Sequence, residues 1–432
     1  QNISDEVMWN QSMPAYLPSE ADIQIGWYGN SNTGLFKNIY RRGLAERYGK
    51  RMQCIAGVHY NYSLPDALWP LLETEGKTLQ EQRSNGYLAL IRNFTRYSWL
   101  LMYLFGASPI VSKDFLQGHD LPLEPIGPDS YCLPWATSLR MSNLGYQNKE
   151  AQAELQLCYN DLETFLLRMH RAATTPWPAY AEIGTHRAGE WIQLNTNILQ
   201  IENEYYSNIR PKRTPTADER PATALANRGV EYIEVRCLDI DPFDPVGLSL
   251  ATARFLDAFL LFCAVEPSSV FPDGGFCQDS KNNFALVVTE GRKPGLLLRN
   301  QHKQEVELKT WAEEILLAMQ PYVELFDKGT GAQLYQDALQ EQLAKVQDAS
   351  LCPSAQLLRQ VQESGLSFVD FTYAQSQAHK ETLLAQPMSS AVLDQFTAEA
   401  AASLTKQSQI EQVEAGQSFE SYLQAFENKM TL

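Results

Sequence analysis

Residues 229–241 alternate between apolar and polar side chains, which is the pattern of a β-strand whose two faces meet different surroundings. Glu234 and Arg236 lie on the same face, and the apolar side chains of the other face are expected to be buried. A carboxylate held beside a guanidinium group can bind a divalent cation and the phosphate oxygens that the cation bridges, as phosphoryl transfer requires. An ordinary solvated ion pair between antiparallel strands is the alternative interpretation of this segment taken alone.

The length and composition of the chain indicate a globular protein with a large core. Its 432 residues are 44% hydrophobic and 11% aromatic, and the longest apolar run, residues 99–105, is too short to span a bilayer. The seven cysteines are scattered without a Cys-x-x-Cys pair, and the six histidines show no metal-ligand spacing. We therefore expect a cytoplasmic protein without disulfide bonds or zinc, in which any bound metal ion is a hard cation held mainly by carboxylates.

Charge divides the chain into two parts. Residues 301–432 contain 8 Lys and Arg but 18 Asp and Glu, so they carry −10 of the formal net charge of −16. This acidic charge argues against nucleic acid as a partner. We predict a catalytic unit over residues 1–300 and an acidic helical region over residues 301–432. Positive charge in the first part forms two groups that suit a small polyanion such as ATP, with ordinary surface charge as the alternative: Arg41 with its basic neighbours, and Arg210, Lys212 and Arg213.

Two long helices are expected in the first part of the chain. The loop at residues 29–34 precedes a helical pattern that extends to Tyr48, with Asn32 or Thr33 as the expected N-cap, and this helix N-terminus could bind an anion. The loop has the glycine spacing of a P-loop, but hydrophobic residues occupy the positions where that motif needs Lys and Ser or Thr. A second helix is expected over residues 79–105, because a Gly and a Pro follow it closely.

Two further segments alternate as strands. Residues 52–64 place His59 and Asn61 on one polar face, which could bind a ligand; a buried, hydrogen-bonded histidine is the alternative. Residues 190–206 alternate as a strand that leads into the basic loop at residues 210–215. Loops of that length between strands are often functional.

Eight blocks of sequence together resemble the bacterial branch of the glutamate-cysteine ligase family, and their order and spacing extend from residue 28 to residue 295. The blocks are YGNSNTGLFK at 28–37, GVHYNYSLP at 57–65, YLFGASP at 103–109, ATSLRMSNLGY at 136–146, LQIENEY at 199–205, IRPKR at 209–213, EYIEVR at 231–236 and EGRKPG at 290–295.

The resemblance implies a glutamine-synthetase-like α+β fold, with a central, mostly antiparallel sheet, surrounding helices and a helical C-terminal region. It implies ATP-dependent joining of the γ-carboxylate of L-glutamate to the amino group of L-cysteine through a γ-glutamyl phosphate, the first step of glutathione biosynthesis. ATP would be a substrate, and Mg²⁺, with Mn²⁺ as the alternative, would neutralise its phosphates. A cytoplasmic monomer is expected, with neither nucleic acid nor a membrane as partner.

The resemblance also assigns roles to individual residues. Glu234 and His59 correspond to residues at the metal site, and Arg236 to the residue that stabilises the transferred phosphoryl group. Arg140 corresponds to a contact with the glutamate carboxylate or the acyl phosphate, and Arg41 to an anion contact. The residues that resemble the cysteine pocket, with plain core packing as the alternative for the tyrosines, are Tyr40, Leu44, Gln53, Tyr146 and Tyr206.

The chain departs from the family pattern at its start, because the opening residues QNISDEVMW resemble an internal family segment. The family's preceding strand and helix supply a Glu-x-Glu arrangement and further carboxylates to the metal sites. The chain as given is therefore expected to bind magnesium poorly and to turn over slowly. Two alternatives stay open: a related carboxylate-amine ligase with another amine substrate, and a non-catalytic fragment that binds a nucleotide or an amino acid.

Overall fold

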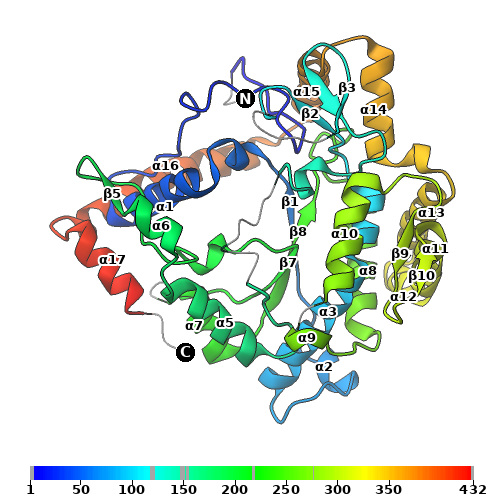
Figure 1. Cartoon of the computed structure of the whole chain (residues 1–432), viewed down its shortest axis with the longest axis horizontal. Helices are drawn as coiled ribbons and strands as arrows, with labels where there is room; N and C mark the ends of the chain where they lie inside the picture. Colours follow the sequence, from blue (N-terminus) through cyan, green and yellow to red (C-terminus); the bar gives the residue numbers. More distant parts are fainter. Residues whose placement is uncertain are drawn as a thin grey trace.

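A small antiparallel sheet surrounded by helices forms the centre of the protein (Figure 1). The computed structural model describes residues 4–116, 122–145, 151, 155–216, 219–275 and 277–429. The central sheet consists of β1 (Val58–Tyr62), β8 (Tyr232–Leu238) and β7 (Ile209–Lys212), with β8 in the middle and antiparallel to both neighbours. The predicted α+β class, with an antiparallel central sheet and a helical C-terminal region, is confirmed.

The other described strands form three smaller antiparallel sheets, made by β2 (Ile110–Ser112), β4 (Ser130–Cys132) and β3 (Glu124–Pro125), by β5 (His186–Arg187) and β6 (Glu190–Trp191), and by β9 (Leu297–Arg299) and β10 (Glu305–Glu307). The described helices are α1 (Asn32–Tyr48), α2 (Leu68–Leu71), α3 (Leu79–Phe105), α5 (Leu162–Thr174), α6 (Pro178–Ile183), α7 (Pro221–Arg228), α8 (Leu250–Val265), α9 (Pro272–Gly275), α10 (Gln278–Glu290), α11 (Leu308–Ala318), α12 (Gln320–Thr330), α13 (Leu334–Gln347), α14 (Pro353–Ser364), α15 (Phe368–Ala385), α16 (Ser390–Glu414) and α17 (Phe419–Glu427).

Helix α3 is the main support of the central sheet. It packs against β7 and β8 and against α8 and α10, and most of its side chains are buried. Its start is set by a capping box, in which the Thr78 side chain accepts from the backbone of Glu81 and the Glu81 side chain accepts from the backbone of Thr78. Its end lies before Gly106, so the prediction of a helix over residues 79–105 is confirmed.

The N-terminus of α1 is bound by two carboxylates of helix α16. The N-cap is Ser31, so the expected cap at Asn32 or Thr33 was wrong by one or two positions. Glu414, the last residue of α16, accepts from the backbone nitrogen of Thr33 at 3.0 Å and from its hydroxyl at 2.6 Å. Glu411 accepts from the backbone nitrogen of Asn30 at 2.9 Å. The anion that this helix end attracts is therefore part of the protein.

Two predicted strands differ from the structure. The strand expected over residues 52–64 is shorter, because residues 51–54 form a turn of 3-10 helix and only Val58–Tyr62 pair with β8. The strand expected over residues 190–206 was wrong. Only Glu190–Trp191 is a strand, and the rest is a folded segment held by buried side chains such as Gln193 and Gln200. Its alternation comes from polar side chains that turn inward to bond backbone groups rather than from sheet pairing.

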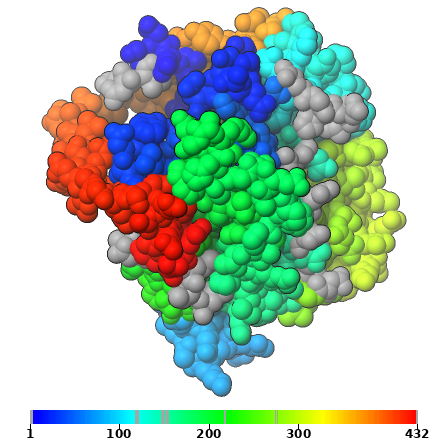
Figure 2. Space-filling view, turned by 60° about the vertical axis from the view of Figure 1, so that its left-hand side comes forward, coloured from blue at the N-terminus to red at the C-terminus, as the bar shows by residue number. Residues whose placement is uncertain are grey.

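Several of the C-terminal helices share core clusters with earlier parts of the chain. Helices α11 to α13 contribute Ile315, Val323 and Leu339 to the core cluster that contains residues of α3 and α8. Helix α17 places Leu423 in a separate cluster with Ile39 of α1 and two residues of the 190–206 segment, and Figure 2 shows these three parts in contact on one face. Among the described helices, none has a stretch long and apolar enough to cross a membrane.

Candidate active site

The polar face of the central sheet gathers charged side chains from all three strands. On β8, Ile233, Val235 and Cys237 are buried, whereas Glu234 and Arg236 lie on the opposite face, as the alternation predicted. The register places Glu234 beside Asn61 of β1 and beside Arg210 of β7. A register irregularity between Val58 and Tyr60 lies at His59, and this side chain reaches the same face.

Glu234 is surrounded by cationic groups and an imidazole. Its Oε1 lies 3.4 Å from His59 Nδ1, and its Oε2 lies 3.5 Å from Lys212 Nζ and 3.7 Å from Arg236 Nε. Arg236 Nε in turn lies 3.4 Å from His59 Nε2. Burial raises the pKa of the Glu234 carboxyl, but the hydrogen bond from His59 and the charges of Lys212 and Arg236 outweigh burial and lower the pKa to about 2.

Two guanidinium nitrogens on this face lack a protein partner. Arg210 Nε and Arg236 Nη1 are buried, and neither donates a hydrogen bond to any described residue. Burial and the charge of Arg236 lower the pKa of Arg210 to about 10, and burial lowers the pKa of Lys212. With Glu234 as the single carboxylate among these three cations, the face has excess positive charge and unused donors. It is therefore suited to bind a multivalent anion.

The structure separates Arg213 and Arg41 from this face. Arg213 Nε donates to the carbonyl of Gly229 at 2.7 Å and one of its Nη atoms to the carbonyl of Arg228 at 2.8 Å. The guanidinium of Arg41 lies 4.7 Å from the ring centre of Tyr28, and Arg41 Nη1 donates to a carbonyl of its own helix. The phosphate contacts expected from these two residues stay predictions.

Arg140 is buried behind the site. Its Nε donates to Asp239 Oδ1 at 2.7 Å and its Nη2 to the carbonyl of Cys237 at 2.5 Å. Burial opposes the charge on Arg140, but the carboxylate of Asp239 outweighs it and the pKa is raised. The expected contact of Arg140 with a substrate anion stays a prediction. Its Nη1, which lies against Gly57 and has no hydrogen bond with the described residues, is the atom that could make it.

The residues expected to form the amine pocket lie on α1 and on a loop near Arg236. Tyr40 and Leu44 are one turn apart on α1, and both are partly exposed. The exposed Gln53 lies in the short 3-10 helix that follows and approaches the carbonyl of Arg41 at 3.5 Å. The Tyr206 ring lies 5.5 Å from the Arg236 guanidinium. Tyr146 lies outside the described residues.

An apolar cavity of about 170 Å³ opens beside the cationic strand β7. Its walls include Phe165 and Met169 of α5 and Leu225 of α7, and its polar side includes Arg210 and Lys212. A wider cleft of about 590 Å³ is lined by Tyr206 and Met141. Tyr159, Tyr205 and Ser207 line both the cleft and the cavity. A flat apolar group could therefore lie next to the anion-binding face.

A family model described as Glutamate-cysteine ligase matches residues 1–287. The chain belongs to the glutamate-cysteine ligase family. The glutamate-cysteine ligase of Bordetella parapertussis is 57% identical over 413 residues, which are 96% of this chain and 78% of that protein. The glutamate-cysteine ligase of Azotobacter vinelandii is 53% identical over 431 residues, which are 98% of this chain and 81% of that protein.

Solved structures agree with this assignment. The crystal structure of the glutamate-cysteine ligase of Francisella tularensis in complex with AMP matches with a TM-score of 0.89 and 34% identity, over 98% of this chain and 82% of that chain. A bifunctional glutathione synthetase from Pasteurella multocida shares the fold, with a TM-score of 0.60 and 22% identity over 87% of this chain and 42% of that chain. The resemblance predicted from the sequence is confirmed.

The polar face of the ligase offers two candidate metal ligands, Glu234 and His59, which would suit a hard cation only if a bound nucleotide and water supply its remaining ligands. Among the residues that the structure describes, no group of three or more His, Cys, Asp or Glu side chains is arranged to hold a metal ion. Glu234 and His59 can supply one carboxylate and one imidazole. Mg²⁺ often uses one or two protein carboxylates and completes its shell with phosphate oxygens and water, so these two residues fit a cation bound together with a nucleotide.

Sequence reasoning missed the buried polar residues that hold this part of the ligase in place. Arg47 pairs with Glu204 at 3.0 Å and Arg220 with Glu202 at 2.7 Å, and all four side chains are almost fully buried. The available signal was the polar alternation at residues 200, 202 and 204, which we interpreted as a strand.

Proposed function

We propose that this ligase joins the γ-carboxylate of L-glutamate to the amino group of L-cysteine at the expense of ATP, with the polar face of the central sheet as the site of phosphoryl transfer. The observation that carries the proposal is the pair of buried, unpartnered guanidinium nitrogens beside Glu234, Arg210 Nε and Arg236 Nη1. Buried donors without partners are costly unless a ligand satisfies them, and phosphate oxygens suit guanidinium donors well.

The nucleotide is proposed to lie along β7. Its adenine would occupy the apolar cavity between α5 and α7, where Phe165 and Met169 offer flat, polarisable contacts. Its phosphates would then pass over Arg210 and Lys212 toward Glu234. The AMP complex of the Francisella tularensis relative supports a nucleotide site in this fold. A divalent cation, Mg²⁺ or Mn²⁺, held at Glu234 and His59, would neutralise phosphate charge.

The reaction takes place in two displacements. A γ-carboxylate oxygen of glutamate bonds to the γ-phosphorus of ATP while the bond from that phosphorus to the bridging oxygen breaks, which releases ADP. Arg236 is proposed to stabilise the charge on the transferred phosphoryl oxygens through its free Nη1. The amine of cysteine then bonds to the acyl carbon, the bond from that carbon to the phosphate oxygen breaks, and the amine loses a proton.

The amine substrate is proposed to bind between α1 and the loop that carries Tyr206. Tyr40, Leu44 and Gln53 would line one side and Tyr206 the other, and the family resemblance assigns Tyr146 to the same pocket. Arg140 would contact the glutamate carboxylate or the acyl phosphate through its Nη1. A small pocket of phenols and an amide can orient an amine and a thiol without requiring another charged group.

The direct test is ADP release by the purified protein with Mg²⁺, ATP and glutamate, measured with and without cysteine, together with mass detection of γ-glutamylcysteine. We expect cysteine to stimulate ADP release and the dipeptide to form in equal amount. Equal stimulation by a panel of other amino acids would favour a related ligase with a different amine. Absence of any product, also from a version extended by the family's N-terminal segment, would contradict the proposal.

Arg210 and Arg213 provide a matched test of the nucleotide position. Arg210→Gln is expected to raise the KM for ATP about 10- to 100-fold, since it removes a charge-assisted contact worth about 1.5–3 kcal/mol. Arg213→Gln is expected to lower the thermal midpoint and to raise the KM for ATP much less than Arg210→Gln does, since the Arg213 guanidinium binds backbone carbonyls although its side chain also lines the cavity. Equal increases in the KM for ATP would show that Arg213 also contacts phosphate, as the sequence predicted.

A further inference from the structure

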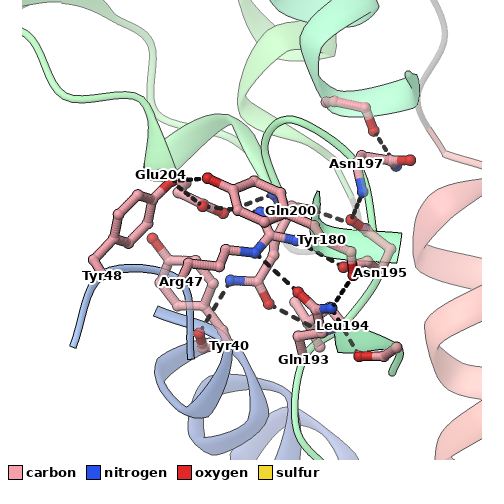
Figure 3. A network of polar contacts seen from close by, with 12 residues as sticks. Tyr40, Arg47, Tyr48, Tyr180, Gln193, Leu194, Asn195, Asn197, Gln200 and Glu204 are labelled. Carbon is pink, nitrogen blue, oxygen red and sulfur yellow. Dashed lines mark hydrogen bonds and ion pairs between the residues drawn. The ribbon is translucent and has the colours of Figure 1, made fainter. Parts of the chain in front are cut away.

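The ion pair between Arg47 and Glu204 is one of the most deeply buried charged contacts in the described structure (Figure 3). It joins the last turn of α1 to a segment that lies far away in the sequence, and both side chains are 0% exposed. Arg47 Nη1 lies 3.0 Å from Glu204 Oε1. Neither group belongs to the polar face of the central sheet, so the proposed chemistry does not use them directly.

The two charged groups form several further contacts inside the protein. Arg47 Nε donates to Gln193 Oε1 at 2.9 Å, one Nη atom donates to the Asn195 carbonyl at 2.7 Å, and the guanidinium carbon lies 4.1 Å from the ring centre of Tyr180. Glu204 Oε1 also accepts from the hydroxyl of Tyr48 at 2.8 Å. Such a network allows one arrangement of its elements and resists small displacements.

Gln200 extends the network to the middle of α1. Glu204 Oε2 accepts from the backbone nitrogen of Gln200 at 2.7 Å. The side-chain nitrogen of Gln200 donates to the carbonyl of Tyr40 at 3.2 Å, and its oxygen accepts from the backbone of Leu194 at 3.0 Å. A Cβ atom at Gly43 would lie 2.1 Å from this oxygen, so only glycine lets Gln200 approach the helix.

The network therefore connects the two sides of the proposed amine pocket. Tyr40 and Leu44 lie on the helix that Arg47 and Gln200 hold. Tyr206 lies two residues beyond Glu204, where its ring contacts the Arg236 guanidinium. Between them, the carbonyl of Asn203 accepts from Arg210 at 3.1 Å. A change in the position of Glu204 must then alter the distance between Tyr40 and Tyr206.

We propose that Arg47 and Glu204 are positioning residues of the ligase, which set the width of the amine pocket by holding α1 against the segment of residues 200–206. The inference rests on the proposed function, because it assumes that Tyr40, Leu44 and Tyr206 surround the amine substrate. A pair this deeply buried gives little net stability compared with apolar residues, since desolvation offsets the attraction. What the pair contributes is one defined position of α1 relative to residues 200–206.

The test is steady-state kinetics of Glu204→Gln and Arg47→Met with ATP, glutamate and cysteine varied in turn. A displacement of about 1 Å in a substrate pocket can reduce kcat/KM about 10²-fold, and we expect such a loss for cysteine, mainly through KM. The rate of glutamate-dependent ADP release without cysteine is the internal reference. In each variant it is expected to stay within about threefold of the rate of the unaltered protein. The double variant Arg47→Met/Glu204→Gln should lose no more than either single variant, because the two residues act as a unit.

Asp327→Asn is the control for a general loss of stability. Asp327 is also a buried carboxylate, and it accepts two backbone hydrogen bonds of 2.9 Å from Tyr335 and Gln336, far from the pocket. We expect it to change no KM. If a single variant does not fold, Arg47→Met/Glu204→Leu replaces the pair by apolar side chains and supplies the same measurement.

Parallel loss of all activities in the Glu204 variants, or an unchanged KM for cysteine, would overturn the inference. Absence of cysteine-dependent turnover in the unaltered protein would instead overturn the proposed function, and with it the pocket that the inference concerns.

Discussion

Replacing Glu234 with glutamine is expected to lower the kcat of the ligase about 10²- to 10³-fold, the usual cost of removing one preorganised electrostatic contact from a reacting centre. The glutamine has the same shape but cannot balance the charges of Lys212 and Arg236, and it binds a divalent cation far more weakly than a carboxylate does. The rate is measured as ADP release at saturating ATP, glutamate and cysteine. Glu231→Gln makes the same chemical change just before the same strand, where the carboxylate contacts Thr214 and Arg213, and it should leave kcat unchanged.

The unaltered ligase and its Glu234→Gln variant, compared across pH, also test the charge state of Glu234. Because its pKa is lowered to about 2, the carboxylate is ionised at every pH at which the enzyme can be assayed. The ratio of the two kcat values should therefore be constant between about pH 6 and pH 9. A ratio that falls toward one on the acidic side would mean that Glu234 takes up a proton in this range, which would contradict the described arrangement of cations around it.

Replacing Asp239 with alanine is expected to lower the free energy of unfolding by about 3–5 kcal/mol, the typical cost of breaking a buried ion pair from one side. Asp239 accepts from the backbone of Ala107 at 2.9 Å and from the hydroxyls of Ser108 and Ser138 at 2.7 and 3.1 Å, in addition to its 2.7 Å contact with Arg140. These donors would lose a shared charged acceptor in the buried interior. Urea denaturation followed by circular dichroism measures the change.

The control for this experiment is the exposed ion pair between Glu46 and Arg187, whose two contacts are 2.9 and 2.8 Å long. Glu46→Ala should leave the denaturation midpoint almost unchanged, because solvent already screens the pair. Similar losses in both variants would mean that Asp239 is not the centre of a buried network. A stable Asp239→Ala variant with altered substrate KM values would instead assign Arg140 to binding rather than to the core.

The sequence predicted the part of the site that depends on local periodicity. Glu234 and Arg236 share a face because side chains alternate along any strand, and the apolar residues of the opposite face indicate which side is buried. The bounds of α3 followed from local signals as well, since a capping box and a terminal Gly act within a few residues. Periodicity also placed His59 on a polar face that could bind a ligand, and the family resemblance then assigned it to the metal site.

The remaining features depend on contacts between distant parts of the chain. Residues 200, 202 and 204 alternate as a strand would, but their partners are Tyr40, Arg220 and Arg47, which local patterns cannot identify. Arg210 and Arg213 look equivalent in the sequence. Only the structure shows that the guanidinium of Arg210 has an unused donor, whereas that of Arg213 binds two backbone carbonyls and lies near the Glu231 carboxylate.

The capping of α1 by Glu414 has a consequence for the synthesis of the protein. Thr33 and the carboxylate that it binds are 381 residues apart, so α1 leaves the ribosome long before its partner exists. At about 5–20 residues per second, translation of the intervening residues takes roughly 20–80 s. During this time the N-terminal end of α1 lacks the carboxylates that bind it. A product that ends prematurely, before α16, would therefore keep the contacts of Arg47 and Gln200 that hold the rest of α1, but its first turn would have no Glu414 to accept from Thr33.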